Sequence, residues 1–167
     1  MDIFHTLGWQ EILLRLGSAT LSGAVLGLNR ELKGKPAGLR TNALVSLGAA
    51  LLVLGGVGIT LGSDSARQAD VVSRAMQGII TGIGFLGAGV ILRDTSGTQV
   101  HGLTTAATIW LTATLGVLCG LGMWHVALLG AGLTLVILIL GHPLEKFLHH
   151  KFPKLSEHHR DNPPPDA

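Results

Sequence analysis

Five apolar stretches, each about long enough to cross a lipid bilayer, fill most of this 167-residue chain. A bilayer core about 30 Å thick requires about 20 residues of helix, and somewhat fewer where flanking side chains reach back to the interface. We therefore predict an all-α integral membrane protein with about five transmembrane helices. The predicted spans are residues 9–28, 41–61, 71–92, 103–120 and 124–140.

The composition supports a membrane protein and excludes other classes. Hydrophobic residues make up 47% of the chain and charged residues only 13%, whereas soluble domains carry about 25% charged residues. The mean hydropathy is +0.50. A net charge of +2 and 4% aromatic residues give no basis for nucleic-acid binding. The single cysteine, Cys119, excludes an intramolecular disulfide and a thiol metal site.

The apolar run ends close to the C-terminus, at Gly141-His142-Pro143. We predict a transmembrane domain over residues 1–142 and a cytoplasmic tail over residues 143–167. Because the tail is polar and Pro-rich, we expect it to be largely disordered beyond a short amphipathic stretch.

Lysine and arginine predict the orientation of the spans. Nine of these residues fall on one side and three on the other, and the richer side of a short-looped membrane protein faces the cytoplasm. We therefore expect the C-terminus to be cytoplasmic and the N-terminus to lie on the outer side, which is periplasmic if the membrane is a bacterial inner membrane. The nine are Arg30, Lys33, Lys35, Arg40, Arg93, Lys146, Lys151, Lys154 and Arg160, and the three are Arg15, Arg67 and Arg74.

Two look-alike loops connect the first four spans, over residues 27–43 and 89–107. In each loop an Arg-acid pair closes one apolar run, and Gly-Leu-x-Thr-x-Ala opens the next. The distance from Arg30 to Arg93 is 63 positions, and that from Thr41 to Thr105 is 64. One interpretation is a parallel repeat of helices 1–2 and 3–4, related by an axis along the membrane normal. The other is chance similarity in a chain rich in Gly, Leu and Thr.

If the repeat is real, the polar residues of both loops converge at the cytoplasmic face as a candidate functional cluster. The alternative is that the charges set the orientation while Thr41 or Asn42 and Thr104 cap the helices that follow. We call this set the cytoplasmic cluster: Arg30, Glu31, Arg40, Asn42, Arg93, Asp94, Thr104 and Thr105.

A second candidate polar group, the outer cluster, consists of Asp70, Arg74 and Gln77. Asp70 and Arg74 are four residues apart and can pair on one helix face. The alternative role for Arg74 is a snorkelling side chain with a local partner. We expect the deeper hydroxyls of Thr81, Thr108 and Thr112 to bond backbone carbonyls of their own helices.

Small residues four positions apart recur along the chain, as in Gly23 and Gly27 or Gly116 and Gly120. Such pairs let helix backbones approach closely in lipid. The densest glycine run, in the third span, predicts a central and closely packed helix. A nucleotide-binding loop is disfavoured because no strand precedes this run. The predicted packing residues there are Gly82, Gly84, Gly87 and Gly89.

The distribution of reactive side chains gives no basis for an enzyme. All ten acidic residues lie in loops, tails or span ends, whereas cation-coupled pumps usually need an ionisable group near the middle of the membrane. We find no nucleophile-base pair and no zinc-type ligand set, and we expect no cofactor and no metal site. The tail histidines could bind a metal, but a solvated tail offers no fixed geometry. They are His149, His150, His158 and His159.

Several linked motifs resemble the MgtC/SapB family. They are Gly-Leu-x-Arg-Glu at 27–31, Lys-Pro-Ala-Gly-Leu-Arg-Thr at 35–41, Arg-Ala-x-Gln at 74–77, Thr-Gly-Ile-Gly-Phe-Leu-Gly-Ala-Gly-Val-Ile-Leu-Arg at 81–93 and Gly-Leu-Thr-Thr-Ala-Ala-Thr-Ile-Trp at 102–110. The resemblance covers about residues 10–140. It implies a bacterial inner-membrane protein with about five spans, and links some members to growth in low magnesium, intracellular survival and inhibition of the rotary ATP synthase. Many members also carry an ACT-like C-terminal domain, for which the tail here is too short.

Two functions remain open from the sequence. The first is a non-enzymatic protein of magnesium homeostasis that acts within the bilayer through contacts with a membrane-protein partner or with its own copies. The second is a small ion or solute transporter or channel.

Overall fold

The computed structural model describes residues 3–93 and 100–151, with side chains for residues 7–91, 100–141 and 143. It contains five helices and one short β-ribbon, and each helix includes a stretch long and apolar enough to cross a membrane. The predicted five-helix membrane architecture is therefore confirmed. The elements are α1 (Ile3–Leu32), α2 (Leu39–Ile59), α3 (Ser65–Gly89), β1 (Leu92–Arg93), β2 (Val100–His101), α4 (Leu103–Gly120) and α5 (Trp124–Lys151).

The chain divides into two compact units, residues 1–131 and 132–167. The first unit holds α1 to α4 and the first turns of α5. Within the second unit α5 continues past Pro143 to Lys151, so the start of the predicted tail is helical. The rest of that tail, residues 152–167, lies outside the described part of the chain.

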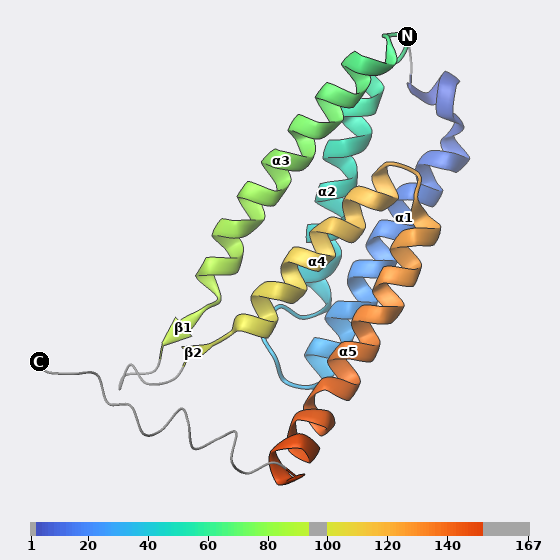
Figure 1. Ribbon diagram of the computed structural model, residues 1–167. Helices are drawn as coiled ribbons and strands as arrows, with labels where there is room; N and C mark the ends of the chain where they lie inside the picture. The colour runs from blue at the N-terminus through green and yellow to red at the C-terminus, as the bar shows by residue number, and fades with distance from the viewer. Residues whose placement is uncertain (1–2, 94–99, 152–167) are drawn as a thin grey trace, which may run out of the picture. The chain divides into compact units, whose positions relative to one another are not determined.

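Helices α2 and α4 form the centre of the first unit. Each of them packs against the other and against both α1 and α3, and α3 lies at the edge of this group (Figure 1). Only 11% of the apolar window of α3 is buried, against 56% for α4. The prediction that the third span is the central helix is therefore wrong.

The contact of α1 with α2 depends on two glycines. A Cβ atom on Gly23 would lie 2.4 Å from the carbonyl oxygen of Asn42, and one on Gly27 would lie 2.5 Å from that of Gly38. Contacts this short leave no room for a side chain, so the two backbones touch directly.

The same arrangement recurs between α4 and α2. A Cβ atom on Gly116 would lie 2.1 Å from the carbonyl oxygen of Ser46, and one on Gly120 would lie 2.7 Å from that of Ala50. The four carbonyls are spaced every four residues and so lie along one face of α2. We call this row the α2 carbonyl stripe: Gly38, Asn42, Ser46 and Ala50. Close packing at both glycine pairs, as the spacing predicts, is confirmed.

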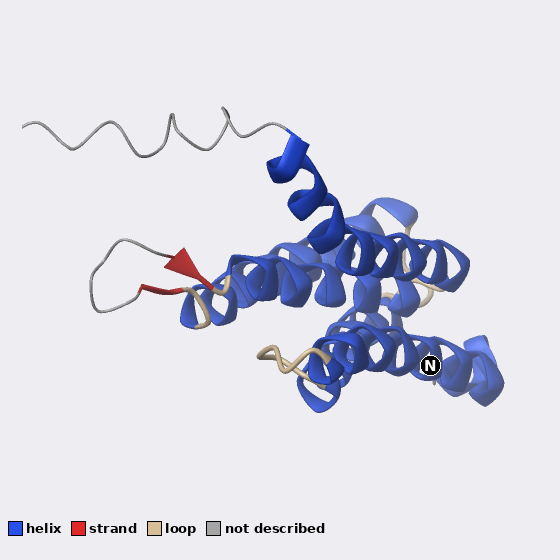
Figure 2. Ribbon diagram, turned by 90° about the horizontal axis from the view of Figure 1, so that it is seen from below, coloured by secondary structure: helices blue, strands red, loops and turns tan. Residues whose placement is uncertain are grey.

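A β-ribbon joins the end of α3 to the start of α4, with Leu92 opposite His101, and projects beyond these two helices (Figure 2). Gly102 follows it and caps α4 with φ of +91°. A Cβ atom there would lie 1.9 Å from the carbonyl oxygen of Val90. Glycine is therefore required at this position for two reasons, the left-handed backbone and the lack of space.

Candidate functional site

Arg30 connects the two look-alike loops. It lies in the last turn of α1 with only 5% of its surface exposed, and its guanidinium donates a hydrogen bond to Oγ1 of Thr105 in the first turn of α4. Its Nε has no hydrogen-bond partner, and among the described residues no carboxylate lies within ion-pair distance. The structure thus brings these two members of the cytoplasmic cluster together.

Asn42 makes a second connection across the bundle. Its side chain is fully buried, and the amide nitrogen donates to the carbonyl oxygens of Ala37, at 2.5 Å, and Gly38, at 3.1 Å. Its Oδ1 accepts a hydrogen bond of 2.9 Å from Oγ1 of Thr112 in α4. Asn42 therefore fastens both the loop that precedes α2 and the α2–α4 contact.

The other members of the cytoplasmic cluster do not converge on these two. Glu31 accepts a 2.9 Å hydrogen bond from the backbone nitrogen of Leu39 and so serves the start of α2. Arg40 and Thr104 are exposed. The side chain of Arg93 and the whole of Asp94 lie outside the described part of the protein.

The predicted helix caps are wrong. The N-cap residues of α2 and α4 are Gly38 and Gly102, and neither makes a side-chain cap hydrogen bond. Both helices begin before the residues expected to cap them, so Thr41, Asn42 and Thr104 already lie within the first turns.

The deeper threonine hydroxyls divide between two kinds of partner. The prediction for Thr112 is wrong, because its hydroxyl bonds to Asn42 of α2 and not to a carbonyl of its own helix. Thr81 and Thr108 do bond carbonyls of their own helices, as predicted. Of the three, only Thr112 therefore links two helices through its side chain.

Buried polar side chains are concentrated in α1, α2 and α4. These helices contribute Ser22, Arg30, Asn42, Ser46, Thr105, Thr108 and Thr112. In the described part of α3 the buried residues are two isoleucines and a glycine. The interior of the first unit therefore contains polar groups that bond mainly to one another or to nearby backbone, while the polar residues of α3 face outward.

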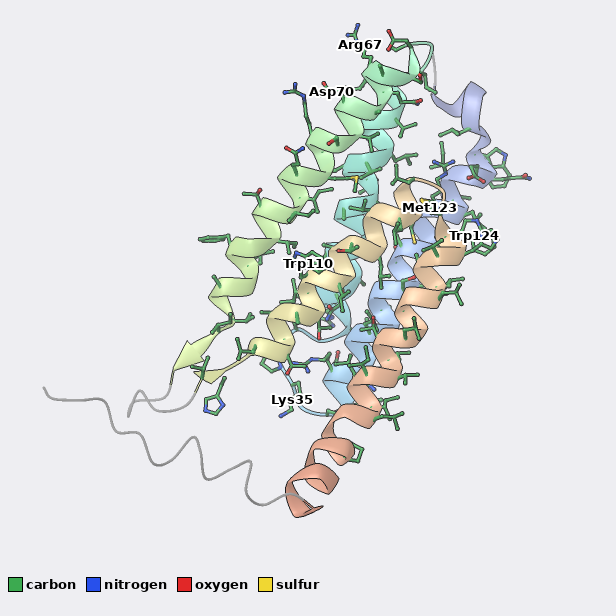
Figure 3. All side chains as sticks on the ribbon, in the orientation of Figure 1. Lys35, Arg67, Asp70, Trp110, Met123 and Trp124 are labelled. Carbon is green, nitrogen blue, oxygen red and sulfur yellow. The ribbon has the colours of Figure 1, made fainter. Side chains whose placement is uncertain are left out.

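The outer cluster lies on that outward side of α3. Arg74 Nε is 2.9 Å from Asp70 Oδ2, which confirms the predicted pair, and both side chains are exposed, at 76% and 58%. Gln77 donates a 3.2 Å hydrogen bond to Oγ of Ser73. Figure 3 shows Asp70 at one end of the first unit and Lys35, in the loop between Glu31 and Arg40 of the cytoplasmic cluster, at the other end.

Arg15 is a structural residue that the sequence did not assign to either cluster. Its Nε is 2.8 Å from Oε1 of Glu11, and its Nη1 donates a 3.0 Å hydrogen bond to the carbonyl oxygen of Gly120. The spacing of Glu11 and Arg15, four residues apart in the sequence, could have predicted this ion pair. The hydrogen bond to Gly120 of α4 could not have been predicted from the sequence, because every residue type provides a backbone carbonyl.

Of the four glycines predicted to pack helices, only Gly87 faces another helix within the described part of the chain. A Cβ atom added to Gly87 would lie 3.6 Å from the Cβ of Ala106 in α4. A Cβ atom on Gly82, Gly84 or Gly89 would have no atom within 4 Å. Phe85, between them, is 83% exposed. Their predicted packing role is therefore not realised within the first unit.

An apolar crevice lies where α3 meets α4. It has a cavity volume of about 30 Å³, and its lining includes Ile79, Ile83 and Trp110. Trp110 lies between the two helices, as Figure 3 shows. The volume corresponds to about one water molecule, so the crevice is a packing gap and not a binding site for a solute.

The described residues contain no group of three or more His, Cys, Asp or Glu side chains that could hold a metal ion. The side chains of the tail histidines lie outside the described part of the protein, so the expectation for them stays a prediction.

Comparison with known proteins gives extensive similarity. The chain is 43% identical over 168 residues to the protein SrpB of Synechococcus elongatus, covering 95% of this chain and 91% of SrpB. It is 47% identical over 116 residues to the protein MgtC of Salmonella typhimurium, covering 70% of this chain and 46% of MgtC. It is 37% identical over 138 residues to the "Putative magnesium transporter YhiD" of Escherichia coli, covering 80% of this chain and 62% of YhiD. The chain thus spans nearly all of SrpB but about half of MgtC. No solved structure matches the chain.

The family assignment follows from the extent of the match. The sequence pattern of the MgtC family matches residues 16–147, which include most of α1, all of α2 to α4 and most of α5. Both connecting loops fall within this range, together with the five apolar helices of a multi-pass membrane protein. This chain belongs to the MgtC family.

Proposed function

We propose that this protein is a non-enzymatic component of the bacterial inner membrane that serves magnesium homeostasis by contacting another membrane-spanning chain. The link to magnesium is supported by the name of the relative YhiD and by the family's association with low-magnesium growth. The positive-inside distribution supports a periplasmic N-terminus and a cytoplasmic C-terminus.

The observation that carries the contact function is the division of polar residues between the helices. Inside the first unit, Asn42 and Thr112 are fully buried and bonded to each other, so they fasten helices together. On α3, by contrast, Arg74 and Gln77 are exposed within a helix long enough to span the membrane. A polar surface that faces hydrocarbon is unfavourable unless protein covers it. The exposed face of α3 is therefore the surface through which this protein meets a partner.

The contact function is tested by photocrosslinking in living cells under low magnesium. A photoreactive phenylalanine analogue at Phe85, which is 83% exposed, should capture a membrane protein. The same analogue at Leu44 of α2, which is 67% exposed, is the control and should capture little.

A growth assay links that contact to magnesium. In a strain that lacks this gene and grows poorly in low magnesium, Gly82→Leu should insert normally but fail to restore growth. Gly17→Leu is the matched control and should restore growth, because both glycines have open space around the added side chain. Full rescue by Gly82→Leu together with no captured protein would contradict the proposal.

Transport is the second candidate function. It is supported by the name of YhiD and by polar atoms without partners in the buried interior, namely Nε of Arg30, Oγ of Ser46 and Oδ1 of Asn29. Purified protein in proteoliposomes should then carry Mg²⁺ or another solute down a gradient, and Asp70→Asn and Asp94→Asn should abolish the flux. Absence of flux from the unmodified protein in every gradient tested would eliminate this candidate.

A further inference from the structure

Helix α3 has an apolar face that packs against the rest of the bundle and a polar face that points outward, whereas a helix surrounded by lipid is expected to have an apolar outward face. Its apolar residues Ile79 and Ile83 are buried against α2 and α4, whereas Arg74, Gln77 and Thr81 face away from them. Thr81 lies seven residues beyond Arg74, which places it roughly 10 Å deeper along the helix axis. These side chains hydrogen-bond within α3, Arg74 to Asp70, Gln77 to Oγ of Ser73 and Thr81 to the carbonyl oxygen of Gln77. Ionisable side chains in a membrane span nevertheless almost always face protein or a cavity, so this face is suited to contact with protein.

Three positions on the same face are glycines and carry no side chain. Gly78, Gly82 and Gly89 have open space around them, and Gly78 and Gly82 are four residues apart. Glycines with this spacing allow a second helix to approach until the backbones meet, and polar side chains beside them can then bond across the contact. The exposed Phe85 lies between them on the same side.

Resting on the proposed contact function, we propose that the partner at this face is a second copy of this chain, packed through a parallel α3–α3 contact in a two-fold dimer. The outer face of α3 comprises Asp70, Arg74, Gln77, Gly78, Thr81, Gly82, Phe85 and Gly89.

Self-complementarity identifies a second copy as the partner. Two copies inserted in the same orientation place identical residues at the same depth, and a two-fold interface then pairs this face with itself. Beyond its bond to Ser73, the Gln77 side chain keeps a second amide hydrogen and its oxygen as acceptor, so it can bond its own counterpart.

The charges on the face are also complementary to themselves. Asp70 and Arg74 carry opposite charges one helical turn apart, with their polar atoms 2.9 Å apart in the single chain. In a parallel pair, Arg74 of each copy can bond Asp70 of the other without leaving an uncompensated charge. A partner with a strongly basic or strongly acidic face would leave one of these two residues opposed by a like charge.

Disulfide crosslinking in native membranes tests the contact directly. In a Cys119→Ala background, Thr81→Cys should form a covalent dimer under mild oxidation, because the two copies bring this position together. Leu44→Cys, on the exposed face of α2, is the matched control and should stay monomeric. Gly82→Leu should lower the fraction of crosslinked dimer severalfold, because the added side chain keeps the two helix backbones from approaching each other.

Charge exchange between differently tagged copies tests the geometry. One copy carries Asp70→Arg and so has two arginines on the face, while the other carries Arg74→Asp and so has two aspartates. Co-expression of these copies, each with Thr81→Cys, should give mixed dimers in several-fold excess over the two like dimers. A statistical mixture, or dominance of like dimers, would overturn the proposed pairing.

The outcomes separate this inference from the proposed function. Capture of a different membrane protein at Thr81→Cys, with no dimer, would overturn the second copy as partner and leave the contact function standing. Dimer formation through α3 combined with full growth rescue by Gly82→Leu would uphold the dimer and contradict the proposed function.

Discussion

Asn42 shows how one amide can organise a membrane-embedded bundle. Its nitrogen holds two carbonyls of the preceding loop and its oxygen holds the hydroxyl of Thr112, so a single buried side chain connects the loop, α2 and α4. A buried polar atom that loses its partner costs roughly 1–3 kcal/mol, although interhelical hydrogen bonds in membranes average nearer 0.6 kcal/mol.

The first prediction concerns that hydrogen bond. Thr112→Val keeps the shape of the side chain but removes the donor, so it should lower the free energy of unfolding in detergent micelles by roughly 0.6–2 kcal/mol. Thr114→Val is the control, because the hydroxyl of Thr114 bonds the carbonyl oxygen of Trp110 in its own helix, at 3.1 Å, and this hydrogen bond is exposed. It should change stability by less than about 0.5 kcal/mol.

A double-mutant cycle with Asn42→Ala completes this test. If the two residues act through one hydrogen bond, the second substitution should cost less in the presence of the first. Strictly additive losses would show that Asn42 and Thr112 stabilise the fold independently.

At the scale of elements, α1 and α4 pack directly against the backbone of α2. The α2 carbonyl stripe receives glycines of α1 along its first half and glycines of α4 along its second half, so both contacts depend on the absence of side chains. Helix α3 instead packs through larger side chains, with Ile79 and Ile83 in the apolar core. The two modes of packing explain why α3 is less buried than its neighbours.

The second prediction compares two glycines of different setting. Gly116→Ala would place a methyl group 2.1 Å from the carbonyl oxygen of Ser46, so α4 must shift away from α2. We expect a loss of roughly 1–3 kcal/mol, measured by thermal or denaturant unfolding. Gly48→Ala meets nothing within 4 Å, and should be neutral or stabilising by up to about 1 kcal/mol, since alanine favours helix over glycine. Equal effects of the two substitutions would contradict the close-contact explanation.

The sequence predicted some of these elements and not others, for identifiable reasons. Apolar length alone located the five spans, and local spacing predicted both the Asp70–Arg74 pair and the close approach of Gly23 to a neighbouring helix. The position of α3 was misjudged because a glycine run has the same sequence whether it faces a helix of its own chain or the outside.

The long-range contacts of the site could not be predicted in this way. The contacts of Arg30 with Thr105 and of Asn42 with Thr112 join residues 75 and 70 positions apart. No local pattern encodes such a pairing, because it depends on which helices become neighbours in the bundle.

At the scale of the whole molecule, the four helix ends next to the cytoplasmic cluster must all lie on one side of the membrane. We propose from the charge distribution that this side is the cytoplasm. The Arg30–Thr105 contact requires the end of α1 and the start of α4 to be close together. In the proposed orientation, the turn between α2 and α3 lies on the periplasmic side.

The third prediction tests that orientation with single cysteines in a Cys119→Ala background. Ser63→Cys, in the exposed turn after α2, should react with a membrane-impermeant maleimide added to spheroplasts. Lys35→Cys, in the exposed loop before α2, should react only after the membrane is broken. The reverse labelling pattern would show that the protein has the opposite orientation in the membrane.

The α2 carbonyl stripe implies an order in which the helices pack together during synthesis of the chain. Helix α1 is made before α2, so the first half of the stripe can be covered as soon as α2 enters the membrane. The second half must wait for α4, about 60 residues later, which at roughly 5–20 residues per second is several seconds of translation. Throughout that interval the carbonyls of Ser46 and Ala50 are not covered by α4. The nascent chain then exposes a surface of α2 against which only a helix with suitably spaced glycines can pack closely.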